Sequence, residues 1–436
     1  MARKVFISIL GTNFYEKCKY TFNNTSSTET RFAQQAVLEL IQANNWDKNS
    51  KCFIFTTKKA YEYNWDISER IKYPEEMEYK YTGLKSVLNN MQLPFKTEHI
   101  HIQDGKDENE IWEIFDTIFN LLEENDELYV DLTHSFRYLP MLLLVLTNYA
   151  KFLRNIKIKH ISYGNFESRN KDTNEAPIID LLPIASLQDW TFAAADYLEN
   201  GNASRLKMLS AEKINPILRE TKGEDQAASF IKELINALID VTEDFQTCRG
   251  MNIIEATNLS KLKQHLNQFD KSIINPLEPL MNKIKEAFSD FDNKENIING
   301  IQAASWCYNN GLYQQSATIM QESVVTAFCL RHNLSIDDES IREGINGLLS
   351  LINAKITNEK TKEDLESLKK KDYIQLILKD ELLNDKELTG SYNSLRSLRN
   401  DINHSGMRSK QPPLCSTRIK NRLKSELEFL SNKLIK

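Results

Sequence analysis

The sequence predicts an α/β domain followed by an all-α region. Apolar strands alternate with amphipathic helices over residues 1–185, and strand-like patterns are absent from about Ser186 onward. Glycine accounts for 13 of 436 residues, about 3% against a usual ~7%, which favours long helices. A chain of 436 residues suits two or three domains rather than one.

The first region reads as a parallel sheet covered by helices on both faces, because its strands are continuously apolar and helices separate them. Strands are predicted at Lys4–Leu10, Lys51–Thr57, Lys96–Ile102, Glu127–Leu132, Ile156–Ser162 and Ile178–Leu182. Helices are predicted at Thr28–Ala43, Glu108–Leu122 and Leu139–Leu153. In such sheets a ligand binds beyond the carboxyl ends of the strands.

The second region has helical spacing throughout, with breaks at Pro276–Pro279 and Asp290–Asn299. A final unit begins near Ile301, and its first and last helices are expected at Gln302–His332 and Thr417–Ile435. The predicted organisation is therefore an α/β domain at 1–185, a helical connecting region at 186–300 and a helical domain at 301–436.

Composition excludes several classes of protein. Hydrophobic residues make up 41% and charged residues 27%, as in globular proteins. No apolar run approaches the ~18 residues of a membrane span. The six cysteines are scattered, which favours reduced thiols in the cytoplasm over disulfides or a metal site. The net charge of −6 means that a nucleic acid would need a local basic patch.

A first candidate site is Gly11-Thr12-Asn13, which directly follows the first strand. A glycine and a hydroxyl at the end of a strand let backbone N–H groups approach an anionic ligand. The segment is equally compatible with an ordinary turn, since it has neither the dinucleotide-binding glycine pattern nor a phosphate-binding lysine.

A second candidate site follows the fourth strand and contains Asp131, Thr133, His134, Ser135 and Arg137. Such a density of polar groups between a buried strand and an apolar helix is costly for folding alone. Hydroxyls, a guanidinium and helix N–H groups are well suited to holding phosphates. The structural alternative is a helix cap with surface-facing His134 and Arg137.

A third candidate is Arg399-Asn400-Asp401-Ile402-Asn403-His404, an R-x4-H motif. Its spacing alone decides nothing, because Arg154 and His160 form a similar pair by chance and read as structural. Five residues turn a regular helix by about 500°, so the Arg399 and His404 side chains would point about 140° apart. They would converge only at a frayed helix end or across a symmetric dimer. The Ser405-Gly406 that follows the motif predicts that its helix ends there.

Basic residues cluster behind this motif, with ten Lys and Arg against three Asp and Glu over residues 396–436. The cluster includes Arg408, Lys410, Arg418, Lys420, Arg422 and Lys424. It is either the solvated face of an amphipathic helix or an electrostatic seat for RNA phosphates.

Together these motifs resemble a known arrangement. Gly-Thr after strand one and D-x-T-H-x-x-R after strand four resemble the CARF domain, the CRISPR-associated Rossmann fold. The helical domain with R-x4-H resembles HEPN ribonucleases, and the order of the two is similar to the CARF–HEPN ribonucleases of type III CRISPR systems. The resemblance covers residues 1–185 and 301–436. One departure is Ser135, where the D-x-T-H group usually has glycine.

The resemblance implies a cytoplasmic homodimer, or a higher oligomer, that binds a cyclic oligoadenylate across its CARF interface. Gly11, Thr12, Asn13, Asp131, Thr133, His134, Ser135 and Arg137 would hold this activator. Thr56, Thr57, Lys58, Ser162, Tyr163 and Gly164 are weaker candidates by their position at strand ends. A four-membered ring is favoured over a six-membered one, because its two-fold symmetry matches that of a dimer.

The resemblance also implies metal-independent cleavage of single-stranded RNA to 2′,3′-cyclic phosphate and 5′-hydroxyl ends. His404 would act as general acid or base, and Arg399 would stabilise charge in the transition state. Asn400 and Asn403 would orient the histidine or the scissile phosphate. No metal and no cofactor besides the activator are expected, and residues 186–300 would transmit activation.

Two other functions fit the same residues. A ligand-responsive transcription regulator would carry a DNA-reading motif in its helical half, and it would not depend on His404. A ring nuclease would degrade the cyclic oligoadenylate near Thr133 and Arg137.

Overall fold

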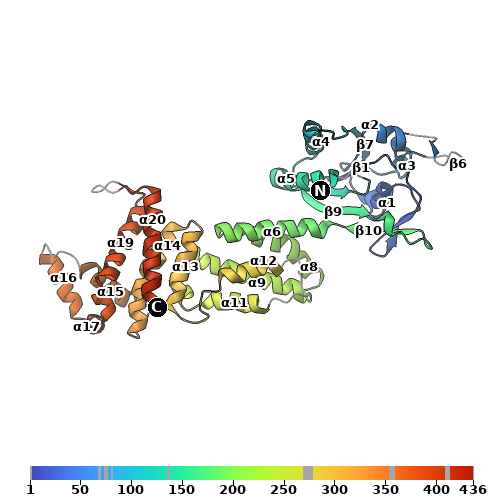
Figure 1. Ribbon diagram of the computed structural model, residues 1–436. Helices are drawn as coiled ribbons and strands as arrows, with labels where there is room; N and C mark the ends of the chain where they lie inside the picture. Colours follow the sequence, from blue (N-terminus) through green and yellow to red (C-terminus); the bar gives the residue numbers. More distant parts are fainter. Residues whose placement is uncertain are drawn as a thin grey trace. The chain divides into compact units, whose positions relative to one another are not determined.

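The computed structural model describes residues 2–66, 70–72, 77–79, 82–134, 138–268, 278–352, 359–407 and 413–435. The chain divides into two compact units, Met1–Ser186 and Leu187–Lys436 (Figure 1). The boundary falls inside helix α6 (Leu182–Asn200). The first unit is α/β and the second is helical, so the predicted fold class is confirmed.

The described part of the first unit contains an eight-stranded sheet in the order β3-β2-β10-β9-β8-β1-β4-β7. In this order, the five strands from β9 to β7 run parallel to one another. They are β1 (Lys4–Leu10), β4 (Lys51–Thr56), β7 (Lys96–His101), β8 (Glu127–Asp131) and β9 (Lys157–Gly164). Parallel pairing brings the carboxyl ends of β1, β8 and β9 to one edge, where both motif-bearing loops begin.

The far edge of the sheet differs from the prediction. Strand β10 (Glu175–Asp180) pairs antiparallel with β9, because the connection over residues 165–174 is too short for a crossover helix. Two short strands that were not expected, β2 (Lys19–Phe22) and β3 (Thr25–Ser26), extend the sheet beyond β10. Helix α1 is shorter than predicted, Ala33–Leu40, because Thr30 pairs with Cys18 instead of continuing the helix.

Alternate side chains of the central strands build two cores, one on each face of the sheet. Val5, Ile7 and Ile9 of β1 pack with α4 (Glu108–Leu121) and α5 (Leu139–Arg154). Phe6 and Leu10 face the other way and pack with α1 and α3 (Leu84–Asn90). The remaining short elements of this unit are η1 (Ala43–Asn45), α2 (Lys58–Ala60), η2 (Tyr61–Trp65), β5 (Arg70–Lys72), β6 (Met77–Tyr79) and η3 (Phe166–Ser168).

The second unit consists of helices around one continuous apolar core, which extends from Trp190 to Leu430. Its elements are α7 (Ser204–Leu209), η4 (Ser210–Ile214), α8 (Asn215–Glu220), α9 (Gln226–Gln246), α10 (Gly250–Ile254), α11 (Thr257–Gln268), α12 (Glu278–Ala287), α13 (Ile297–Asn309), α14 (Tyr313–Arg331), α15 (Glu339–Leu351), α16 (Glu359–Lys369), α17 (Asp372–Ile377), α18 (Glu381–Asn384), α19 (Lys386–Asn403) and α20 (Ser416–Leu434). The expected boundary at residue 300 lies within this unit and stays a prediction.

Helix α14 lies at the centre of the second unit and packs against α13, α15, α19 and α20 (Figure 1). It is buried on all sides, with Met320, Val324 and Phe328 fully enclosed. The single helix predicted at Gln302–His332 is in fact α13 and α14, because Gly311 adopts a φ of +77° and breaks it. The C-terminal helix agrees with its prediction to within one residue at each end.

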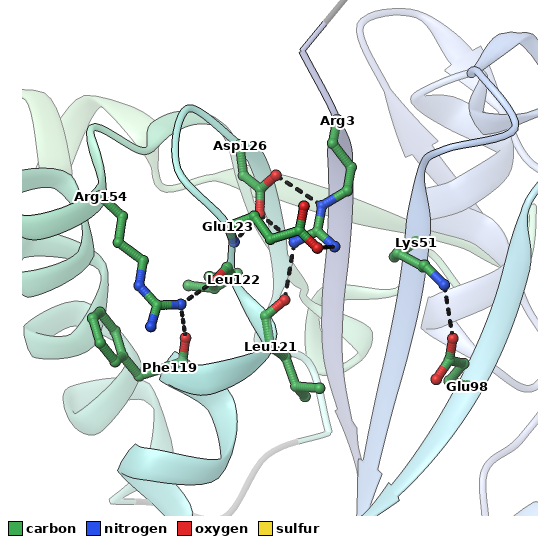
Figure 2. Close-up of polar contacts among 9 residues, drawn as sticks. All are labelled: Arg3, Lys51, Glu98, Phe119, Leu121, Leu122, Glu123, Asp126 and Arg154. Atoms are coloured by element: carbon green, nitrogen blue, oxygen red, sulfur yellow. Dashed lines mark hydrogen bonds and ion pairs between the residues drawn. The ribbon is translucent and has the colours of Figure 1, made fainter.

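An ion pair between Arg3 and the buried Asp126 joins the amino ends of β1 and β8 (Figure 2). The Arg3 guanidinium donates to both oxygens of Asp126, at 2.8 and 2.6 Å, and to the carbonyl of Leu121 at 2.9 Å. The Asp126 side chain is 1% exposed. A carboxylate at such a depth needs a partner, and Arg3 supplies it where the two strands begin.

Arg154 makes a comparable contact where α5 ends (Figure 2). Its guanidinium donates to the carbonyls of Phe119 and Leu122 near the end of α4 and lies 3.9 Å from the centre of the Phe119 ring. His160 is buried in β9 against Phe22. The structural interpretation of the Arg154 and His160 pair is thus confirmed.

We expect Arg3→Met to lower the free energy of unfolding of the first unit by about 3 kcal/mol, because it leaves the Asp126 carboxylate buried without its cation. Urea unfolding of the full chain, with hydrogen exchange on β1 and β8 peptides, measures this loss. Lys51→Met is the matched control, since the Lys51–Glu98 pair is part-exposed at 2.9 Å and its loss should cost less than ~1 kcal/mol. Equal losses of stability in Arg3→Met and Lys51→Met would contradict the greater importance of the buried Arg3–Asp126 pair.

Candidate functional site

A buried carboxylate organises the carboxyl ends of β1, β8 and β9. Asp131 is 0% exposed and accepts hydrogen bonds from the Ser8 hydroxyl at 2.7 Å and the Thr133 hydroxyl at 2.5 Å. The Thr133 N–H also donates to it at 3.2 Å. Burial raises the pKa of Asp131, and the hydrogen bonds from Thr133 and Ser8 oppose this shift.

Thr133 connects this network to the next strand. Its hydroxyl donates to Asp131 and accepts from the Gly164 N–H at 2.8 Å. A Cβ at position 164 would lie 2.8 Å from the Tyr20 ring and 3.1 Å from the Thr133 methyl, so only glycine allows this approach. The loop after β8 is therefore held to the end of β9.

The loop after β1 is fixed by an asparagine from elsewhere in the chain. The buried Asn64 amide donates to the carbonyls of Gly11 at 2.7 Å and Asn13 at 2.8 Å. Gly11 is required because a Cβ there would lie 2.8 Å from the carbonyl oxygen of His134. Thr12 is partly exposed and Asn13 is exposed beside this contact. The two predicted loops thus touch each other.

His134 packs inward rather than toward solvent. Its ring stacks on Tyr15 with the centroids 3.8 Å apart and the planes at 21°. The Nε2 atom is buried without a hydrogen-bond partner in the part of the chain that the structure describes. Burial lowers the pKa of His134 to about 3, so the ring is neutral near pH 7.

Several expected ligand residues are structural instead. Asp131 is wholly enclosed, so its predicted contact with the ligand is corrected to a role in holding Thr133. Thr56 forms a hydrogen bond with the His99 ring at 2.7 Å, and Thr57 caps α2. Ser162 of β9 is buried and donates to the Val130 carbonyl of β8. Lys58 and Tyr163 are exposed. Ser135 and Arg137 lie outside the described residues.

In the second unit, Arg399 lies on α19 next to an acidic side chain of α14. Its Nη1 atom is 3.7 Å from Glu322 Oε1, and the other oxygen of Glu322 pairs with Arg342 at 2.7 Å. The Arg399 side chain is 27% exposed, and its Nε atom is buried without a hydrogen-bond partner among the described residues. Glu322 thus lies between two guanidinium groups and orients Arg399.

His404 occupies the position immediately after α19. Its N–H donates to the Asn400 carbonyl at 3.1 Å, and its side chain is exposed. Ser405 and Gly406 follow with φ of 53° and 70°, and the Gly406 N–H bonds the Asp401 carbonyl at 2.8 Å. The predicted helix end at Ser405-Gly406 is confirmed. The bond from His404 to Asn400 is the helical i→i−4 bond, so His404 continues the turn of α19, and a regular helix would place its side chain about 140° around the axis from that of Arg399.

The two asparagines of the motif differ in their surroundings. Asn400 is partly buried and supplies the carbonyl that holds the His404 backbone. The Asn403 amide oxygen accepts from Gln314 Nε2 of α14 at 3.0 Å. Both residues therefore shape the end of α19, where His404 lies.

Sequence reasoning missed Tyr15, Asn64, Glu322 and Gln314. All four reach their partners from distant segments, and no local pattern marks them. Ser8 was detectable, because it interrupts an otherwise apolar strand with a buried hydroxyl.

Among the described residues, no three His, Cys, Asp or Glu side chains are grouped so as to hold a metal ion. The same residues include no helix with the length and apolar character of a membrane span.

Three comparisons with known proteins bear on this arrangement. Residues 5–167 match the family model described as the CARF domain of the CRISPR system endoribonuclease Csx1. A CRISPR-associated protein of Methanocaldococcus jannaschii is 28% identical over 243 residues, which cover 53% of this chain and 34% of that protein. The structure of Enterococcus italicus Csm6 bound to cyclic hexa-2′-fluoro-hexa-dAMP is 11% identical, with a TM-score of 0.45, and the match covers 100% of this chain and 94% of that one.

The first unit is therefore a CARF domain, with the candidate site at the strand ends of that domain. The family match confirms the CARF part of the resemblance for residues 5–167. It spans about a third of the length of its Methanocaldococcus relative.

We expect Thr133→Val to destabilise the first unit by about 1–3 kcal/mol, because it leaves the Gly164 N–H and one Asp131 oxygen short of a hydrogen bond. The change keeps the shape of the side chain. Thermal unfolding measures the loss, and Thr133→Ser, which restores the hydroxyl, should recover most of it. Equal loss in both variants would show that the methyl group, not the hydroxyl, matters.

We expect protonation of His134 to oppose folding at low pH. Its folded pKa of about 3 lies below its ordinary value of about 6.5, so the unfolded chain binds the extra proton. The stabilisation is complete above pH ~6.5 and is lost as the pH falls toward ~3. Urea unfolding between pH 7 and 4 gives the free energy of unfolding as a function of pH. In His134→Gln the slope of this free energy against pH should be shallower than in the parent protein, by up to about 1.4 kcal/mol per pH unit. The same dependence of unfolding free energy on pH in both proteins would contradict the burial of the His134 ring.

Proposed function

We propose that the chain is a cyclic-oligoadenylate-activated endoribonuclease of a type III CRISPR antiviral defence system, acting in the cytoplasm. It cleaves single-stranded RNA without a metal ion and leaves 2′,3′-cyclic phosphate and 5′-hydroxyl ends. The observation that carries this proposal is the pairing of a CARF site organised by Asp131 with a helical unit that presents Arg399 and an exposed His404 at one helix end.

The activator binds at the paired loops of the first unit. Gly11, Thr12 and Asn13 offer backbone and side-chain donors next to Thr133, and the Asn64 and Asp131 contacts hold both loops in place. Preformed donors suit the phosphates of a cyclic oligoadenylate. Ser135 and Arg137 complete the set of proposed contacts from the sequence motif.

The exposed face of α5 supports a homodimer. Large apolar side chains recur on it at intervals of three and four residues, with Met141 72% and Phe152 78% exposed. Val145 and Tyr149 lie between them and are also exposed. Soluble monomers rarely expose such a continuous apolar stripe. A second copy of the chain would cover it by a two-fold, self-complementary contact, and higher assembly would build on this dimer.

A dimer also favours a ring with matching symmetry. A cyclic tetra-adenylate presents the same groups to both protomers around a two-fold axis, so we expect it to activate better than the cyclic hexa-adenylate.

At the second site, His404 acts as general acid or base in the attack of the ribose 2′-hydroxyl on the adjacent phosphate. Its exposed position after α19 leaves the imidazole accessible to RNA. Arg399, oriented by Glu322, stabilises the charge that develops on the phosphate. Asn400 and Asn403 position His404 through the helix end.

Activation requires that the ring bind the active dimer more tightly than the resting one. A ring that contacts both protomers meets this condition, because a change in their mutual rotation alters its contacts. The helices of residues 186–300 are proposed to transmit the change.

We expect cyclic tetra-adenylate to raise the rate of single-stranded RNA cleavage at least about a hundredfold, with EDTA having no effect. His404→Ala should lower the rate by about 10²–10⁴, the contribution of one general acid or base. The measurement compares cyclic tri-, tetra- and hexa-adenylate by gel analysis of labelled RNA.

His265→Ala, on α11 of the same unit, is the control and should leave cleavage unchanged. Full ring-stimulated cleavage by His404→Ala would overturn the catalytic assignment. Conversion of the ring to linear di-adenylate by His404→Ala would show that the CARF unit also degrades its activator, and binding of duplex DNA without any RNA cleavage would favour a transcription regulator.

A further inference from the structure

Three segments that are far apart in the sequence meet beside His404. They are the start of α14, the end of α19 and the first half of α20. The Gln314 amide donates to Asn403 at 3.0 Å, and Asn403 directly precedes His404. The Lys420 ammonium lies 5.1 Å from the centre of the Tyr313 ring. An aromatic ring, an amide and a cation thus lie together at the start of α14, and the amide contacts the residue that precedes the proposed catalytic histidine.

The surroundings of this group differ from those of a structural contact. Gln314, Asn403 and Lys420 are exposed, whereas Tyr313 is partly buried. Its ring packs in a T-shaped arrangement with Tyr308, with centroids 5.6 Å apart and an interplanar angle of 69°. The ring is therefore held in one orientation, while the groups around it face solvent.

Exposed contacts of these kinds contribute little to folding. A cation–π pair at the surface stabilises a protein only weakly, and a hydrogen bond between exposed amides competes with water. The same three groups match what single-stranded RNA requires of a protein: an aromatic face for an unpaired base, a cation for the phosphate and an amide for the base edge.

We propose that Tyr313, Gln314 and Lys420 form a subsite for one nucleotide of the RNA strand next to the scissile phosphate. The base stacks on Tyr313 in the place of the Lys420 ammonium, which moves on its flexible stem to the neighbouring phosphate. Gln314 contacts the base edge and so sets a sequence preference near the cut. The inference rests on the proposed function, because it takes RNA as the substrate.

The basic residues of α20 do not contribute equally to this subsite. Lys420 reaches Tyr313, whereas Arg422 donates to Ser394 of α19 at 2.9 Å. Lys261 is exposed on α11, outside the basic cluster of residues 396–436. Lys261 therefore offers a control of equal charge in the same unit.

The test measures binding of a fluorescein-labelled, mixed-sequence single-stranded RNA to the full-length His404→Ala protein in the presence of cyclic tetra-adenylate. Tyr313→Ala should weaken binding about tenfold or more, the effect of losing one base stack. Tyr313→Phe keeps the ring and should bind like the parent protein. Lys420→Ala should lower the slope of log affinity against log salt by about 0.7, the contribution of one phosphate contact to a single strand, whereas Lys261→Ala should leave the slope unchanged.

A second measurement addresses Gln314 in the active protein. Sequencing of the cleaved ends of the same RNA should show that Gln314→Ala changes the bases found at the cut, with the total rate reduced less than tenfold. Thermal unfolding of each variant identifies any that fail to fold. If Tyr313→Ala does not fold, Lys420→Ala keeps the test decisive, because Lys420 is exposed.

Equal binding by the Tyr313→Ala and parent proteins, or equal salt slopes for Lys420→Ala and Lys261→Ala, would overturn the subsite. Failure of the wild-type protein to cleave RNA with any ring would instead refute the proposed function. If RNA binding still depended on Tyr313 and Lys420 in that case, the subsite would be supported as an RNA-binding site although the protein is not a nuclease.

Discussion

The Asp131 carboxylate is the interaction on which the candidate ligand site depends. A fully buried acid must be satisfied, and here Ser8 of β1 and Thr133 after β8 satisfy it. Thr133 in turn bonds Gly164 at the end of β9. One enclosed carboxylate thus fixes the ends of three strands relative to one another. Thr12 and Asn13, which we propose contact the ligand, lie beside these strand ends in a loop that the Asn64 amide holds.

The sequence predicted much of this arrangement, because its causes are local. Apolar strands and helical spacing predicted the parallel part of the sheet, and the density of polar groups after β8 indicated a site. The role of Asp131 was wrong, since a sequence does not show which of several neighbouring polar groups is enclosed. Tyr15 and Asn64 could not be predicted at all, because their partners, His134 and Gly11, come from other segments. Strand β10 was placed near its position but not in its direction.

In the helical unit, too, features set by neighbouring residues in the sequence could be predicted, and contacts between distant segments could not. The helix end at Ser405-Gly406 follows from residues that favour positive φ, and it was predicted. The neighbours of the R-x4-H motif were not. Glu322 and Gln314 both belong to α14. The buried middle of this helix brings Glu322 to Arg399, and its exposed start brings Gln314 to Asn403. The central helix therefore both holds the core together and shapes the proposed cleavage site.

The stoichiometry of ring binding tests the central claim most directly. Calorimetric titration of the His404→Ala protein with cyclic tetra-adenylate follows binding alone, without RNA cleavage. The account predicts one ring for every two chains, since the paired loops around Thr133 of two protomers enclose it. One ring for each chain, or no heat of binding at all, would contradict a site shared across a two-fold axis.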